Sequence, residues 1–182
     1  LLRKRCVDDE GEQESLTEYE YRDDLLLREV FYGEAGELLW EKSYQYNEDE
    51  LLSEITHKKH DEDLEIRKTC AYNAKGHLKE VLTYADDELT ERVIFEPDQK
   101  GRPLKIQEEN RNKKNTISME YDDKGQIVFQ SEQNMQGDII NQVHRSFDAE
   151  GHLLESKVTA FNPMLGMNQH YVEMHIHEKS ED

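Results

Sequence analysis

Apolar and polar side chains alternate over short stretches of this chain, and each stretch ends at a cluster of turn-forming residues. In one such stretch, alternate side chains form one row: Trp40, Lys42, Tyr44 and Tyr46. Glu41, Ser43 and Gln45 fall on the other side. A period of two is typical of a β-strand. The stretches are about eight to ten residues long and rich in Tyr, Val, Ile and Thr, which favours strands over helices.

The pattern recurs six times as an aromatic residue, a small polar residue, a turn, an aliphatic residue and a β-branched residue. The leading aromatics are Tyr21, Tyr46, Tyr72, Phe95, Tyr121 and Phe147. The turn positions are Leu25, Glu50, Gly76, Gly101, Gly125 and Gly151. A second turn signal halfway through each copy divides it into two strands, so each copy predicts a β-hairpin.

These repeats predict an all-β fold, an antiparallel meander of about twelve strands built from six β-hairpin repeats of 23 to 26 residues. Open sheets of more than about ten strands usually curl or close, so we expect a strongly twisted or curled sheet. The array is expected as one domain over residues 16–177. The acidic residues 1–15 are expected to be a disordered or capping lead-in, and residues 178–182 a tail.

Three copies carry a more specific motif. They read Tyr-Asn-Ala-Lys-Gly-His-Leu at 72–78, Tyr-Asp-Asp-Lys-Gly-Gln-Ile at 121–127 and Phe-Asp-Ala-Glu-Gly-His-Leu at 147–153. This motif resembles the YD repeat of Rhs-type and wall-associated bacterial proteins and of teneurins, although Leu25 and Glu50 replace its glycine in the first two copies. The resemblance implies a bacterial hairpin ribbon of the cell envelope or a secreted protein, which encloses or presents something and does not catalyse. MORN repeats have a similar period but a glycine density far above the nine glycines of this chain.

The charge of the chain narrows the choice of partners. Its 182 residues include 23 basic and 42 acidic side chains, which gives a net charge of −19. Nucleic-acid affinity comes largely from Lys and Arg, so we expect no nucleic-acid partner. No apolar run approaches the roughly 18 residues of a membrane helix, so we expect no membrane insertion. Cys6 and Cys70 form no CxxC motif, and Cys70 occupies an aromatic position in a packed row. We expect no cofactor.

The last strand carries the strongest candidate chemistry. Glu173, His175 and His177 share one face of an extended strand, and two histidines at i and i+2 with a carboxylate are able to ligate zinc. The alternative is a solvated polar face on an edge strand, where charge prevents sheets from associating.

A column of carboxylates follows the turns, at Glu29, Glu54, Glu80 and Glu155. Equivalent residues of stacked hairpins would lie two strands apart, about 10 Å. This exceeds the roughly 5.5 Å between the carboxyl groups of retaining glycosidases and is marginal for inverting ones. A solvated face that keeps the sheet soluble is the expected role.

Three hypotheses follow from these patterns. The favoured one is a non-enzymatic β-repeat binding or scaffold module that contacts a protein or a glycan and self-associates through its sheet edges. The second is a metal-dependent or carboxylate hydrolase that uses the C-terminal Glu/His strand. The third is a fragment of a larger Rhs-like shell.

Overall fold

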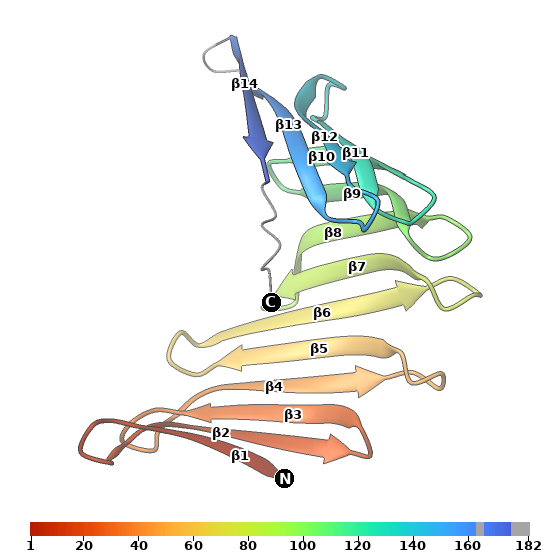
Figure 1. The fold of residues 1–182 in the computed structure, drawn as a ribbon. Helices are drawn as coiled ribbons and strands as arrows, with labels where there is room; N and C mark the ends of the chain where they lie inside the picture. Colours follow the sequence, from red (N-terminus) through yellow and green to blue (C-terminus); the bar gives the residue numbers. More distant parts are fainter. Residues whose placement is uncertain (163–165, 176–182) are drawn as a thin grey trace. The chain divides into compact units, whose positions relative to one another are not determined.

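The structure is a computed structural model that describes residues 1–162 and 166–175, and these ranges contain fourteen β-strands and no helix (Figure 1). The strands are β1 (Leu2–Val7), β2 (Gln13–Arg22), β3 (Leu25–Tyr32), β4 (Leu38–Tyr46), β5 (Leu52–Lys59), β6 (Leu64–Tyr72), β7 (Leu78–Ala85), β8 (Glu88–Pro97), β9 (Pro103–Asn110), β10 (Lys114–Tyr121), β11 (Ile127–Gln133), β12 (Ile139–Phe147), β13 (Leu153–Asn162) and β14 (Met167–Met174). The described residues include no helix long and apolar enough to cross a bilayer.

The strands follow one another in chain order in one antiparallel meander, which confirms the predicted fold class. The expected count of about twelve strands is not confirmed, because the described residues contain fourteen. The six predicted copies, each starting at its leading aromatic, account for β3 to β14, and β1 and β2 precede them. β1 and β14 lie at the two ends of the order, where an outer strand offers free backbone groups for pairing.

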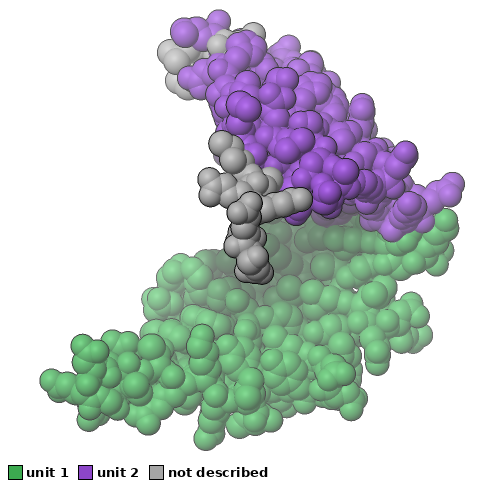
Figure 2. All heavy atoms as spheres, in the orientation of Figure 1, with its two compact units in different colours: residues 1–92 green, residues 93–182 purple. Residues whose placement is uncertain are grey.

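The chain divides into two compact units (Figure 2). Unit 1 comprises Leu1–Arg92 and unit 2 comprises Val93–Asp182, so the boundary falls within β8. Residues 1–15, the expected lead-in, contain β1 and the start of β2. The expected tail, residues 178–182, lies outside the described residues.

One turn geometry recurs at the ends of the even-numbered strands. Gly76, Gly125 and Gly151 have φ of 78°, 88° and 96°, and each donates its N–H to the carbonyl oxygen three residues earlier. These glycines therefore share one setting, the left-handed residue that follows a type I turn and makes a bulge. An Asn or Asp opens each such turn, and its Oδ1 accepts the N–H four residues later. These residues are Asn47, Asn73, Asp98, Asp122 and Asp148.

The first copy departs from this geometry, and the predicted turn position Leu25 is wrong. β2 and β3 are joined by the two residues Asp23 and Asp24, and Leu25 is already the first residue of β3. Asp23 has φ of 54°, a value that Asp tolerates better than most residues. The shorter turn shifts the alignment of the first copy by one residue.

A tyrosine beside each of three turns links neighbouring hairpins. The hydroxyl groups of Tyr46, Tyr72 and Tyr121 donate to the carbonyl oxygens of Leu26, Leu52 and Pro103 at 2.9, 2.8 and 2.8 Å. In the neighbouring strand ladders, regular pairing ends before these carbonyls. The hydroxyl therefore supplies a donor where the ladder no longer does. Burial raises the pKa of Tyr72 and of Tyr121, so both hydroxyls stay protonated as donors at neutral pH.

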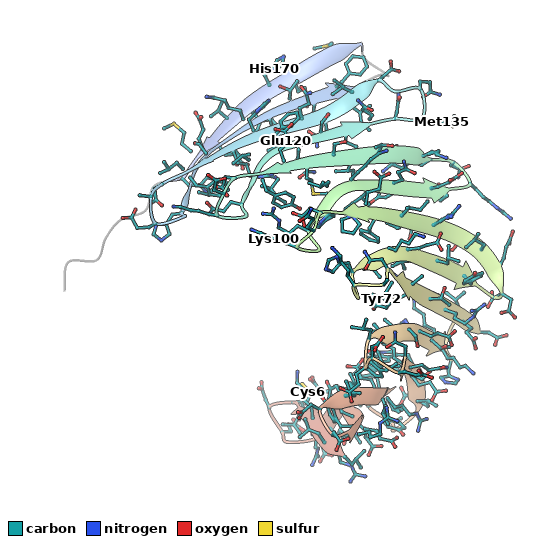
Figure 3. The ribbon with its side chains drawn as sticks, turned by 90° about the vertical axis from the view of Figure 1, so that its right-hand side faces the viewer. Cys6, Tyr72, Lys100, Glu120, Met135 and His170 are labelled. Atoms are coloured by element: carbon teal, nitrogen blue, oxygen red, sulfur yellow. The ribbon has the colours of Figure 1, made fainter. Side chains whose placement is uncertain are left out.

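Burial inside the strands is slight. Among the described residues, Val30 and Val143 are the hydrophobic side chains classed as buried. Side chains project from both faces of the strands (Figure 3). Local turns, strand ladders and contacts between neighbours consequently hold the units, as expected of a repeat array.

Candidate functional site

The strand register assigns each side chain of unit 1 to one of two faces, because residues paired across antiparallel strands point the same way. One row across β2 to β6 consists of Tyr19, Glu29, Lys42, His57 and Ile66. The row beside it consists of Phe31, Trp40, Lys59 and Leu64. A third row contains Tyr44, Ile55, Lys68 and Thr83. We call the surface formed by these three rows the tryptophan face.

The tryptophan face is basic although the chain is strongly acidic. Its three rows contain Lys42, Lys59 and Lys68 against one carboxylate, Glu29, although the Lys59 Nζ is itself paired with Glu62 of the β5–β6 turn at 2.8 Å. Glu29 is already engaged, since its Oε2 accepts the Tyr44 hydroxyl at 2.7 Å and lies 3.8 Å from the Lys42 Nζ. Lys68 is exposed and has no ion-pair partner among the residues that the structure describes.

The opposite face carries cross-strand ion pairs, and we call it the ion-pair face. Its pairs are Arg3–Glu18, Arg28–Glu41, Lys58–Glu65, Arg67–Glu54 and Arg92–Glu80. Such partly exposed pairs contribute little stability, of the order of 0–1 kcal/mol each. They do neutralise most of the charge locally, which leaves the two faces of unit 1 with different chemistry.

A groove lies in the tryptophan face. It has a volume of about 330 Å³ and is lined by Lys42, Tyr44, Ile55, His57, Ile66 and Lys68. Ile55 and Ile66 provide an apolar lining, and Lys42 and Lys68 provide ammonium groups. The His57 Nε2 is shielded from solvent and has no hydrogen-bond partner. Burial, together with Lys42 and Lys59, lowers the pKa of His57, so its imidazole is neutral at pH 7.

Aromatic rings continue the groove along the face. Trp40 stacks on Phe31 with ring centroids 5.3 Å apart and an interplanar angle of 12°, and His57 meets Trp40 edge-on at 5.6 Å. The Lys42 Nζ lies 4.8 Å from the Trp40 ring centroid. Burial and the hydrogen bond to Glu29 raise the pKa of Tyr44, so Tyr44 remains a neutral donor. The result is a platform of rings beside lysine ammonium groups.

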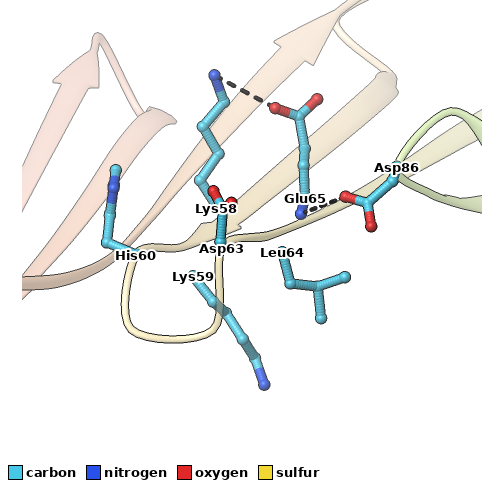
Figure 4. A pocket seen from close by; sticks show the side chains of 7 residues that line it. All are labelled: Lys58, Lys59, His60, Asp63, Leu64, Glu65 and Asp86. Carbon is cyan, nitrogen blue, oxygen red and sulfur yellow. Dashed lines mark hydrogen bonds and ion pairs between the residues drawn. The ribbon is translucent and has the colours of Figure 1, made fainter.

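A second cavity of about 320 Å³ lies at the β5–β6 turn (Figure 4). Its charges are already paired: the Lys58 Nζ lies 3.3 Å from the Glu65 Oε2, and the Glu65 N–H donates to the Asp86 Oδ1 at 3.1 Å. These contacts explain the cavity as a turn stabilised by ion pairs. This cavity therefore offers fewer unpaired polar groups to a ligand than the groove does.

The predicted metal ligands lie at the C-terminal strand. Glu173 is exposed in β14 opposite Ser156. His175 follows the strand, is exposed, and donates its backbone N–H to the Leu154 carbonyl oxygen at 2.9 Å. His177 lies outside the described residues. A zinc site on these three residues stays a prediction.

Other metal-ligand side chains come together in the turn that follows β12. Atoms of Asp148, Glu150 and His152 lie within 4.8 Å of one another. The Asp148 Oδ2 lies 2.9 Å from the His152 Nδ1, and its Oδ1 accepts the His152 N–H at 2.8 Å. Burial would raise the pKa of Asp148, but the hydrogen bonds from His152 and Gly151 outweigh it and lower the pKa to about 2. These contacts stabilise the turn and account for the cluster.

The expected carboxylate column is wrong at Glu29. The register places Glu29 beside Lys42 on the tryptophan face, whereas Glu54 and Glu80 point to the ion-pair face. The two-residue turn at Asp23 and Asp24 is the physical reason, because it makes Arg28 the equivalent of Glu54. The ion pairs of Glu54 with Arg67 and of Glu80 with Arg92 give these carboxylates a structural role.

Sequence reasoning found part of the groove and missed the rest. The predicted common face of Trp40, Lys42 and Tyr44 is confirmed, because alternation within β4 places their side chains on one side of the sheet. His57, Ile66 and Lys68 were missed, since only the register between strands brings them to the same face. The half-buried Cys70 lies on this face beside Val81, and burial raises the pKa of its thiol, so it is an unreactive packing residue.

No family model matches the chain, and no curated protein matches it. Among solved structures, the chain is similar to a porin-like protein from Bacteroides uniformis, with a TM-score of 0.55, 12% identity, and coverage of 93% of this chain and 87% of that one. It is also similar to a chain of the TcdB2-TccC3-Cdc42 structure, with a TM-score of 0.47, 9% identity, and coverage of 96% of this chain and 13% of that one. The first similarity shows a shared β fold and nothing about activity.

Proposed function

We propose that the chain is a non-enzymatic β-repeat module that binds a protein or a glycan through a face of its strands. The observation that carries this proposal is the segregation of chemistry in unit 1. Paired charges gather on the ion-pair face, whereas aromatic rings and lysines gather around a groove on the tryptophan face. Such a surface offers contact area to a ligand without grouping a nucleophile, a base and an orienting residue.

The repeat architecture supports the same proposal. Asx-opened turns and tyrosine hydroxyl bridges recur from hairpin to hairpin, so the turn end of the strands specifies the fold. The side chains on the faces are then free to differ. We propose that the hairpins are YD-type repeats of 23 to 26 residues in a twisted or curled sheet, from a bacterial envelope or secreted protein.

The test is a binding screen that also detects turnover. Labelled chain is applied to glycan and peptide arrays, hits are titrated by calorimetry, and each ligand is analysed by mass spectrometry after prolonged incubation. A ligand that binds saturably and is recovered intact is the expected result. Products from the ligand would instead favour the hydrolase alternative, and their loss in Glu173→Gln/His175→Asn/His177→Asn would assign it to the C-terminal strand. An absence of hits on both arrays would overturn the proposal.

Self-association through the outer strands is a separate part of the proposal. Val172 and Met174 of β14 are 53% and 77% exposed, in a strand at one end of the strand order. Exposed outer strands favour pairing with another chain. Sedimentation velocity over a concentration series should show a dimer, and Val172→Lys should weaken it. A monomer at every concentration would contradict this part alone.

A further inference from the structure

We propose that the groove of the tryptophan face binds an acidic polysaccharide, with Lys42 and Lys68 pairing with its carboxylates and the rings of Trp40 and Tyr44 contacting its sugars. This inference rests on the proposed function and specifies its site and ligand class. It assigns the four residues as ligand contacts, with His57 as a hydrogen-bonding group.

The charge of the face selects an anionic ligand. Lys68 is exposed and unpaired among the described residues, and Lys42 shares the already engaged Glu29 at 3.8 Å. The two lysines come from β4 and β6, two strands apart, which corresponds to a lateral separation of about 10 Å. This is of the order of one disaccharide unit. A chain with one carboxylate on every second sugar would therefore meet both ammonium groups.

The uncharged groups of the groove suit a sugar. The apolar faces of sugar rings pack on flat aromatic side chains, and Trp40 and Tyr44 stand in the two rows that flank the Lys42 row. The His57 Nε2 is a neutral ring nitrogen without a partner, and an unsatisfied buried polar atom is costly. A ligand hydroxyl would satisfy it. Ile55 and Ile66 give the groove an apolar floor on which a sugar ring is able to rest.

The same observations disfavour a nucleic acid. Rings interleaved with lysines also suit single strands, but such ligands carry one phosphate per nucleotide. The net charge of −19 repels a polyanion of that density. A glycan with one carboxylate per disaccharide, such as hyaluronan, has a lower charge density, so the few lysines of the groove balance it. An acidic peptide would use the lysines but not the rings.

The chain contains its own probe for this test. Trp40 is its one tryptophan and contacts His57 and Lys42 of the groove lining, so its fluorescence is sensitive to a ligand in the groove. The full chain is titrated with oligogalacturonate, oligoalginate and hyaluronan oligosaccharides, and with methyl-esterified oligogalacturonate as a ligand of equal size without charge. We expect a saturable change in Trp40 fluorescence with at least one acidic oligosaccharide, weakened by salt, and none with the methyl ester.

The variants distinguish binding in the groove from nonspecific attraction to surface lysines. Lys42→Gln/Lys68→Gln should weaken binding about ten-fold. Lys58→Gln is the matched control for the Lys68 change, because Lys58 is an exposed lysine of the ion-pair face, and it should change affinity by less than about two-fold. Unchanged far-ultraviolet circular dichroism and unfolding midpoints establish that the variants fold. The single variant Lys68→Gln, which alters no ion pair of the native face, is tested in parallel.

Several outcomes would overturn this inference. They are no binding by any of the three acidic glycans, equal binding of the methyl ester, equal losses in the groove and control variants, or tighter binding of single-stranded RNA or a polyglutamate peptide. If the arrays still yield an intact ligand whose affinity the groove variants leave unchanged, the proposed function stands and only this site fails. If no ligand of any class binds, both fail.

Discussion

The hairpins β4–β5 of unit 1 and β10–β11 of unit 2 share their turns and differ in their faces. In both, an Asx residue opens the turn, and a tyrosine hydroxyl, of Tyr46 or Tyr121, donates to a carbonyl of the preceding hairpin. The equivalents of Trp40, Lys42 and His57 in unit 2 are Asn115, Ile117 and Glu132. The two hairpins therefore share the contacts that form their turns, and they differ in the side chains that their faces offer to a ligand.

The largest expected effect on stability comes from substituting Asn115, the equivalent of Trp40 in unit 2. Asn115 is only 3% exposed, and its amide donates to Glu132. Asn115→Ala leaves this half-buried carboxylate without that donor, and we expect a loss of about 2 kcal/mol in the free energy of unfolding. Lys42 is the equivalent of Ile117 on the tryptophan face of unit 1, and Lys42→Gln should lower the free energy of unfolding by less than about 0.5 kcal/mol. Urea unfolding measures both, and equal costs would contradict the distinction between the faces.

The next effect tests the shared turn. Gly125 and Glu50 are equivalent residues with φ of 88° and 59°. A Cβ on Gly125 would also lie 3.2 Å from a guanidinium nitrogen of Arg102, so Gly125→Ala should destabilise the protein by about 1–2 kcal/mol. Glu50→Gly should have the opposite sign, a gain of up to about 1 kcal/mol, because glycine removes the left-handed strain at some entropic cost. A loss of stability in Glu50→Gly would show that the two turns are not equivalent.

A somewhat smaller effect concerns the tyrosine bridges. Tyr46→Phe and Tyr121→Phe each remove a hydroxyl from a half-buried carbonyl, and we expect about 1 kcal/mol of destabilisation in both units. Phe95→Tyr is the converse variant, because Phe95 is the leading aromatic of a copy that lacks the bridging tyrosine hydroxyl. Amide hydrogen exchange resolves the effect to each hairpin, since neighbouring repeats do not always unfold together. Exchange that stays unchanged near Leu26 and Pro103 would contradict the role of the bridges.

The sequence predicted the local features of this fold and not the non-local ones. Gly76, Gly125 and Gly151 are recognisable because only a few residues adopt their backbone angles, and the Asx residues because their side chains bond the next backbone amides. The acidic run at residues 8–14 predicted a disordered or capping lead-in, and the turn there is one in which the Asp8 carboxylate accepts the N–H groups of Glu10 and Glu12.

The candidate site was less predictable for a related reason. The groove depends on the register between β4, β5 and β6, and a shift of one residue moves a whole strand's side chains to the other face. The misplacement of Glu29 arose in this way. The alternation within β4 predicts that Trp40 and Lys42 share a face, but no local pattern predicts that His57 and Lys68 lie on the same face.

The smallest effect is an acid response that separates turns opened by aspartate from turns opened by asparagine. The turns at Asn47 and Asn73 of unit 1 are opened by amides that do not titrate, whereas Asp98 and Asp148 open turns of unit 2. Burial opposes the shift, but the hydrogen bonds from His152 lower the pKa of Asp148 to about 2, and those from Arg102 lower the pKa of Asp98. A lowered pKa means that the ionised carboxylate favours the folded state. This stabilisation is present above about pH 4 and is lost as the pH falls toward 2.

Amide exchange over this pH range should therefore increase at the Arg102 and His152 amides, beyond the intrinsic dependence of exchange on pH, and not at the Leu51 and His77 amides, which are bonded to Asn47 and Asn73. Asp148→Asn keeps an acceptor that does not titrate, so it should abolish the acid response at His152 and leave the one at Arg102. A response at His152 that survives in Asp148→Asn would assign the acid sensitivity to another group. Its loss would show that one turn geometry responds to acid where an aspartate opens it and not where an asparagine does.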